Sequence, residues 1–104
     1  MVPLHMSLDA LDIVHDEVDN RGAFFIEREG RRLAEMTYTR ASDRLVVIDH
    51  TEVQAELQHH GVARRLLDAA VAWARATGTR ISATCSYVMS QFDQDPSIRD
   101  VLDT

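Results

Sequence analysis

The sequence predicts an α/β domain with a mixed sheet of about five strands: a four-strand meander, one long helix, and a fifth strand parallel to the fourth. Three observations predict this fold. Segments rich in β-branched and aromatic residues, separated by turn residues, fill the first half of the chain. The hydrophobic period then changes to that of a helix. A β-prone segment follows, and a strand–helix–strand crossover places its two strands parallel.

The meander strands are expected within residues 12–18, 23–27, 32–40 and 44–53. Turn signals lie between them, at Asn20 to Gly22, at Gly30, and in the polar break at 41–43. The fourth strand contains the apolar run Leu45 to Ile48, which is typical of a central strand buried on both faces.

The main helix is predicted over residues 61–77. Its apolar residues recur at i, i+3, i+4, i+7, i+10 and i+11 and so form one face: Ala63, Leu66, Leu67, Ala70, Trp73 and Ala74. Arg64 and Asp68 lie elsewhere on the helix, at a spacing that allows an ion pair. Gly78 stands where a left-handed residue ends a helix.

The segment after this helix predicts the fifth strand and one or two short C-terminal helices. The strand is expected over residues 80–85, with Cys85 at its end. Ser86 is expected to cap a short helix over 86–92, and Asp95-Pro96 to begin a last helical turn that reaches Leu102.

Composition restricts the class of protein. The chain has 104 residues, 45% hydrophobic and 27% charged, which fits one globular domain over 1–104 with residues 1–10 as a flexible extension. It shows no membrane span and no secretory leader, and its single cysteine fits a reducing cytoplasm. A net charge of −6 argues against nucleic acid or an anionic membrane as partner. All 11 basic residues are arginine.

The most informative segment is QHHGVA, Gln58 to Ala63, between the fourth strand and the helix. The first amides of a helix lack partners within it, and the helix dipole is positive there, so this junction suits a phosphate group. A glycine in this position lets the phosphate approach the backbone. The residues alone leave a second interpretation open, in which Gly61 is a turn residue in a solvated loop.

This run resembles the Q/R-x-x-G-x-G/A signature with which the GNAT acetyltransferase superfamily holds the pyrophosphate of acetyl-CoA. Together with DHTEV at 49–53, CSYV at 85–88 and the Pro96 segment, it is similar to the small YjdJ-like branch, over roughly residues 11–102. The resemblance implies a GNAT-like sheet and acetyl-CoA as cosubstrate. It places the cofactor contacts at Val53, Gln58, His59, His60, Gly61, Val62, Ala63 and Arg64.

The resemblance also suggests where catalysis would occur. In the family, the fourth strand splays from the fifth and the pantetheine arm lies between them, beside the backbone near Glu52 and Val53. His50 and Glu52, two apart and so on one face of the strand, are the candidate general bases. Cys85 is the candidate acid for the leaving thiolate, or a transient acyl carrier. Structural roles remain open for all three, and Tyr87 is an alternative acid or a core residue.

The function that follows is acetyl transfer to an amine by direct attack in a ternary complex. The acceptor is expected to be a small molecule or a peptide or protein. The chain lacks the helices that larger members of the family place between their first two strands, which favours an open site for a peptide or protein end. The alternatives are a CoA-binding or protein-interaction module without turnover and a small anion-binding structural domain. The expected state is a monomer or a homodimer. No metal is expected, because the adjacent His59 and His60 point apart and no carboxylate stands at ligand spacing in the sequence.

Overall fold

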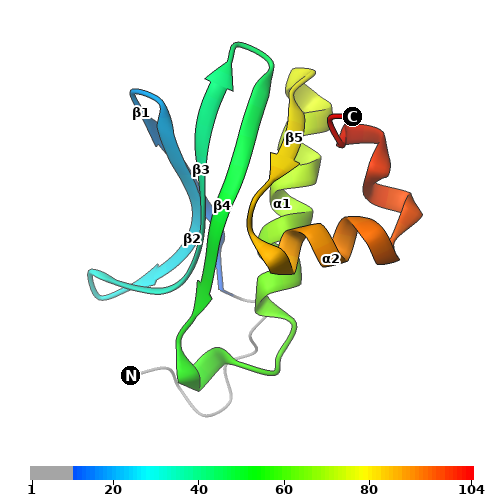
Figure 1. Cartoon of the computed structure of the whole chain (residues 1–104). Coiled ribbons are helices and arrows are strands. Elements are labelled where there is room, and N and C mark those ends of the chain that lie inside the picture. Colours follow the sequence, from blue (N-terminus) through cyan, green and yellow to red (C-terminus); the bar gives the residue numbers. More distant parts are fainter. Residues whose placement is uncertain (1–10) are drawn as a thin grey trace.

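Four antiparallel strands follow one another along the chain before the main helix begins (Figure 1). The computed structural model describes residues 11–104, so the predicted extension at 1–10 lies outside the described residues. The elements, in order, are β1 (Val14–Val18), β2 (Arg21–Arg28), β3 (Arg31–Ser42), β4 (Leu45–Val53), the 3-10 helix η2 (Ala55–Leu57), α1 (Val62–Thr77), β5 (Arg80–Ala83), α2 (Ser86–Gln94) and the 3-10 helix η3 (Pro96–Val101).

The sheet has the strand order β1-β2-β3-β4-β5. The first four strands pair antiparallel, and β5 pairs parallel with β4 after the crossover through α1. This confirms the predicted fold class. The fifth strand is shorter than expected and ends at Ala83, so Cys85 is the residue that precedes α2 and Ser86 is its first residue. No helix in the described part of the chain is long and apolar enough to span a membrane.

The core lies between one face of the sheet and α1. The helix packs on β2, β3 and β4. The buried side chains that meet there include Phe24, Ile26, Met36, Tyr38, Ile48, Leu66, Leu67, Ala70, Val71 and Ala74. We call the opposite face of the sheet the outer face. In Figure 1 both helices lie on the α1 side, so within residues 11–104 the outer face has no helix over it.

Gly22 has a different role from the one predicted. The turn between β1 and β2 is Asp19-Asn20, and Gly22 lies inside β2 opposite Tyr38. A Cβ atom at Gly22 would lie 2.2 Å from Tyr38 Cζ. The glycine is therefore required by the cross-strand approach of a buried aromatic ring rather than by a turn, and local sequence does not reveal this.

A β-bulge in β4 sets which side chains reach the outer face. Thr37 pairs with His50 and Tyr38 pairs with Ile48, which leaves Asp49 as the extra residue. Asp49 accepts a hydrogen bond from Thr37 Oγ1 at 2.6 Å, on the outer face. The bulge therefore places two consecutive residues, Asp49 and His50, on the outer face, and returns Thr51 to the α1 side opposite buried Met36.

A charged cluster joins β1 to β3. The Glu17 carboxylate accepts hydrogen bonds from Arg40 Nε at 2.7 Å and from the Tyr38 hydroxyl at 2.5 Å. The hydrogen bonds from Arg40 and then Tyr38 lower the pKa of Glu17 to about 2, from an ordinary value near 4.5. The ionised carboxylate therefore stabilises the fold, and its protonation removes that contribution.

Glu17→Gln should flatten the acid dependence of stability. Because the folded-state pKa is depressed, the stabilisation by Glu17 is complete above pH ~4.5 and is lost as the pH falls toward ~2. The free energy of unfolding in urea, measured near pH 5 and pH 3, should fall less in the variant than in the wild type. Glu27→Gln, an exposed glutamate of β2, is the control. An equal fall in wild type and Glu17→Gln would contradict the prediction.

Candidate functional site

A cavity of about 300 Å³ opens at the N-terminus of α1, where β4, the connecting loop and α2 meet. It is lined by Val53, Leu57, Gln58, His59, Gly61, Val62, Ala63, Arg64 and Tyr87. The lining contains seven of the eight residues that the sequence predicts for cofactor binding, all except His60. Residues from four elements, β4, η2, α1 and α2, and from the loop before α1 thus form a single concave surface.

The entrance of α1 has the features of an anion site. Gly61 precedes the helix in the left-handed conformation, with φ 73°. A Cβ atom added there would meet no atom within 4 Å, so space lies beside this backbone. No side chain caps the helix and its first turn contains no acidic residue. The first amides of α1 have no acceptor within the helix, so this end of the cavity favours a negatively charged group.

The loop before α1 is held by a side chain. Gln58 Nε2 donates a hydrogen bond to the Val53 carbonyl at 2.9 Å, as expected of a residue that braces the loop. His59 also has a positive φ, 66°, and lines the cavity. His60 is exposed and is not part of the lining. Of the two adjacent histidines that the sequence predicts to contact the cofactor, only His59 lines the cavity.

Arg64 forms a link between α1 and the C-terminal segment. Its guanidinium donates to Asp68 at 2.8 Å, to Gln91 at 2.8 Å, and to Asp95. Hydrogen bonds from Ser97 and then Arg64 lower the pKa of Asp95 to about 2. These contacts give Arg64 a structural role, and its predicted contact with the cofactor stays a prediction.

Tyr87 and Gln91 lie one helical turn apart in α2. Tyr87 lines the cavity and Gln91 accepts a hydrogen bond from Arg64.

The ladder between β4 and β5 covers only Leu45–Ile48. Beyond it, the amides of Thr84 and Cys85 both donate to the Ile48 carbonyl, at 3.0 and 3.3 Å, and the chain turns into α2. On this side, residues 49–53 of β4 pair with no strand of the described chain. The ladder ends because β5 ends at Ala83, and the place of a pantetheine arm beside the free part of β4 stays a prediction.

The predicted catalytic residues lie on opposite sides of β4. Thr51 Oγ1 lies 3.3 Å from Cys85 Sγ on the α1 side. His50 and Glu52 project from the outer face, with Nε2 and Oε2 3.5 Å apart. The structure therefore brings His50 and Glu52 together, as predicted, and places Cys85 across the strand from them.

Tyr87 is nearer to the cavity than the sequence indicates. It lines the cavity and is half-buried. Burial raises the pKa of its hydroxyl, which therefore stays protonated and able to donate.

Comparison with known proteins gives consistent results. The sequence profile of the GCN5-related N-acetyl-transferases matches residues 23–101. A GCN5-like candidate N-acetyltransferase from Staphylococcus aureus has a similar solution structure, with a TM-score of 0.70 and 34% identity over 92% of this chain and 91% of that one. A search of curated proteins found no significant match.

Two more distant structures share the fold alone. A ribosomal-protein-alanine N-acetyltransferase from Brucella melitensis has a TM-score of 0.55 and 15% identity over 64% of this chain and 50% of that one. An IAA acetyltransferase from Bacillus cereus has a TM-score of 0.53 and 18% identity over 78% of this chain and 53% of that one. The chain thus spans nearly all of the Staphylococcus protein and about half of these two.

Proposed function

Because the chain belongs to the GCN5-related N-acetyltransferase family, we propose that it transfers an acetyl group from acetyl-CoA to an amine by direct attack in a ternary complex. The observation that carries the proposal is the cavity at the start of α1, with a left-handed glycine, an uncapped helix and no acidic residue in the first turn. The amides of Val62, Ala63 and Arg64 are the proposed donors to the diphosphate.

The acetyl end is proposed to lie beside the unpaired stretch of β4. A strand edge offers amides that can polarise a thioester carbonyl and stabilise the developing oxyanion. Val53 and Tyr87 line the cavity, and each lies two residues beyond a member of the Thr51–Cys85 contact. This continuity supports a path from the helix entrance to Cys85.

In the proposed reaction, His50 or Glu52 takes a proton from the acceptor ammonium on the outer face. The neutral amine then forms the C–N bond with the acetyl carbon, and the C–S bond to CoA breaks. The departing thiolate receives a proton from Cys85, or from Tyr87, and the second proton released by the acylated nitrogen restores that donor through solvent. Base and acid on opposite faces of one strand suit an acceptor and a thioester that approach from opposite sides.

Titration calorimetry with acetyl-CoA, CoA and ATP tests the binding half of the proposal. Acetyl-CoA and CoA should bind at one site per chain, and ATP should bind more weakly because it lacks the pantetheine arm. Absence of acetyl-CoA binding would overturn the proposal. Release of CoA thiol with a panel of peptide N-termini and small amines tests turnover. Binding without product for any amine would favour a CoA-binding module.

The two adjacent histidines should behave differently. His59→Asn should weaken CoA binding by less than about tenfold, or ~1.4 kcal/mol, because backbone amides supply most donors. Asparagine tolerates the positive φ at this position, so the comparison isolates the imidazole. His60→Asn should leave affinity unchanged, since His60 is outside the cavity lining. Calorimetry of both variants measures this, and a larger loss for His60→Asn would show that the loop closes differently on the ligand.

A further inference from the structure

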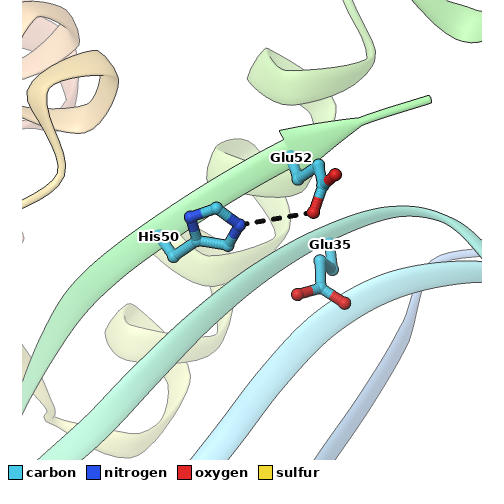
Figure 2. A group of neighbouring side chains, drawn as sticks. All are labelled: Glu35, His50 and Glu52. Atoms are coloured by element: carbon cyan, nitrogen blue, oxygen red, sulfur yellow. Dashed lines mark hydrogen bonds and ion pairs between the residues drawn. The ribbon is translucent and has the colours of Figure 1, made fainter. Parts of the chain in front are cut away.

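Three side chains that are able to bind metal meet on the outer face of the sheet. Figure 2 shows His50 and Glu52 on β4 and Glu35 on the neighbouring strand β3. One ligand atom from each lies within 4.8 Å of the others. Two of the three side chains, His50 and Glu52, stand two residues apart on β4, and strand pairing supplies the third, because Glu35 is the ladder partner of Glu52. Sequence spacing alone does not reveal this cluster, because its third member lies on another strand.

The electrostatics of this cluster are unfavourable without a cation. Glu35 and Glu52 stand directly opposite each other on adjacent strands, and like charges in that arrangement destabilise a sheet. Within residues 11–104 the polar contacts of these two carboxylates are long: Arg32 Nη1 lies 3.5 Å from Glu35, and His50 Nε2 lies 3.5 Å from Glu52. Arg32 is also engaged with Phe25, whose ring centroid is 3.9 Å from the guanidinium carbon.

We propose that Glu35, His50 and Glu52 bind a divalent transition metal ion of the Zn²⁺ type. One imidazole nitrogen and two carboxylate oxygens suit Zn²⁺ and its neighbours better than Ca²⁺ or Mg²⁺, which prefer oxygen ligands alone. Ligand atoms on a tetrahedral zinc ion lie roughly 3.4 Å apart, close to the His50–Glu52 distance. Glu35 needs an inward movement on the order of 1 Å, which its side-chain torsions allow.

Solvent has access to the site. The side chains of His50 and Glu52 are more than half exposed, so a metal enters without any opening of the fold and its fourth position faces water. A bound ion would also engage both candidate bases of the proposed reaction. Metal binding itself is independent of that reaction, because it is measured without CoA or acceptor.

Calorimetric titration of the untagged full chain with Zn²⁺ tests the proposal. One ion per chain should bind the wild type. Glu35→Gln and His50→Gln should each weaken affinity by at least about tenfold, since even residues that only orient metal ligands matter that much. Arg32→Met should strengthen affinity, because it removes a competing cation while the apolar side chain still covers Phe25. Glu27→Gln, on the same sheet, should match the wild type.

Nuclear magnetic resonance of the wild type locates the ion even where a variant fails to fold. Zn²⁺ should shift the resonances of residues 35, 50 and 52 and leave those of the helix α2 unchanged. Absence of Zn²⁺ binding would overturn the proposal. So would wild-type affinity in Glu35→Gln and His50→Gln, or shifts confined to residues 59 and 60.

Discussion

Gly61→Glu is expected to abolish the binding of acetyl-CoA and CoA while leaving the fold intact. The new carboxylate stands at the first amides of α1, where the structure has no acidic side chain and open space beside the glycine. It would repel the diphosphate and accept the hydrogen bonds meant for it. Affinity should fall at least about a hundredfold, or ~2.7 kcal/mol.

Gly61→Gln is the matched control for this prediction. Both substitutions place a side chain of the same length on a backbone with φ 73°, so both should lose about 1 kcal/mol of stability from the left-handed conformation. Only the glutamate adds charge. Thermal unfolding measures the shared loss, and calorimetry measures the difference in affinity. Equal CoA affinity in Gly61→Glu and wild type would remove the basis of the proposed function.

Cys85→Ala is expected to lower turnover roughly 10²–10⁴-fold with the affinity for CoA nearly unchanged. The thiol contacts Thr51 on the α1 side of β4 and is not part of the cavity lining. Its loss should therefore spare ground-state binding, and it removes the proposed proton donor from the transition state. A structural cysteine would behave differently, with a stability loss of about 1 kcal/mol and turnover per folded molecule preserved.

Two further measurements identify the acid. Tyr87→Phe keeps the ring in the cavity wall and removes only the hydroxyl, so a fall in turnover for this variant rather than Cys85→Ala would make Tyr87 the donor. Intact mass after incubation with acetyl-CoA tests for a covalent acetyl-cysteine. The absence of lysine leaves few other sites for an adduct, and hydroxylamine removes only the thioester.

The elements of the fold were predictable because their signals are local. The helical period of α1, the glycine after it and the apolar run of β4 depend on neighbouring residues, and the structure confirms all three. The loop that lines the cavity at the start of α1 was predictable for the same reason, since Gln58 to Arg64 is one continuous segment; its role in phosphate binding stays a prediction.

The remainder of the site depends on partners far apart in the chain. Glu35 reaches Glu52 through strand register, and Asp95 reaches Arg64 across the packing of α1 against the C-terminal segment. The bulge at Asp49 changes the alternation of side chains in β4, and nothing in the local sequence marks it. Local sequence assigns Gly22 to a turn, because a glycine that makes room for a distant ring has the same local pattern as one in a turn.

The short ladder between β4 and β5 has a consequence for self-association. Within the described chain, it leaves residues 49–53 of β4 without a neighbouring strand on the β5 side. An exposed strand edge is a template for pairing with the strand of another molecule. Glu52 is exposed on this part of β4, whereas the carboxylate of Asp49 is turned toward β3 and paired with Arg21. Two molecules that met edge to edge would bring their Glu52 carboxylates near each other, and the repulsion would disfavour pairing. The acidic residue beside the proposed acetyl site would thus also keep the open edge available to ligand rather than to another copy of the chain.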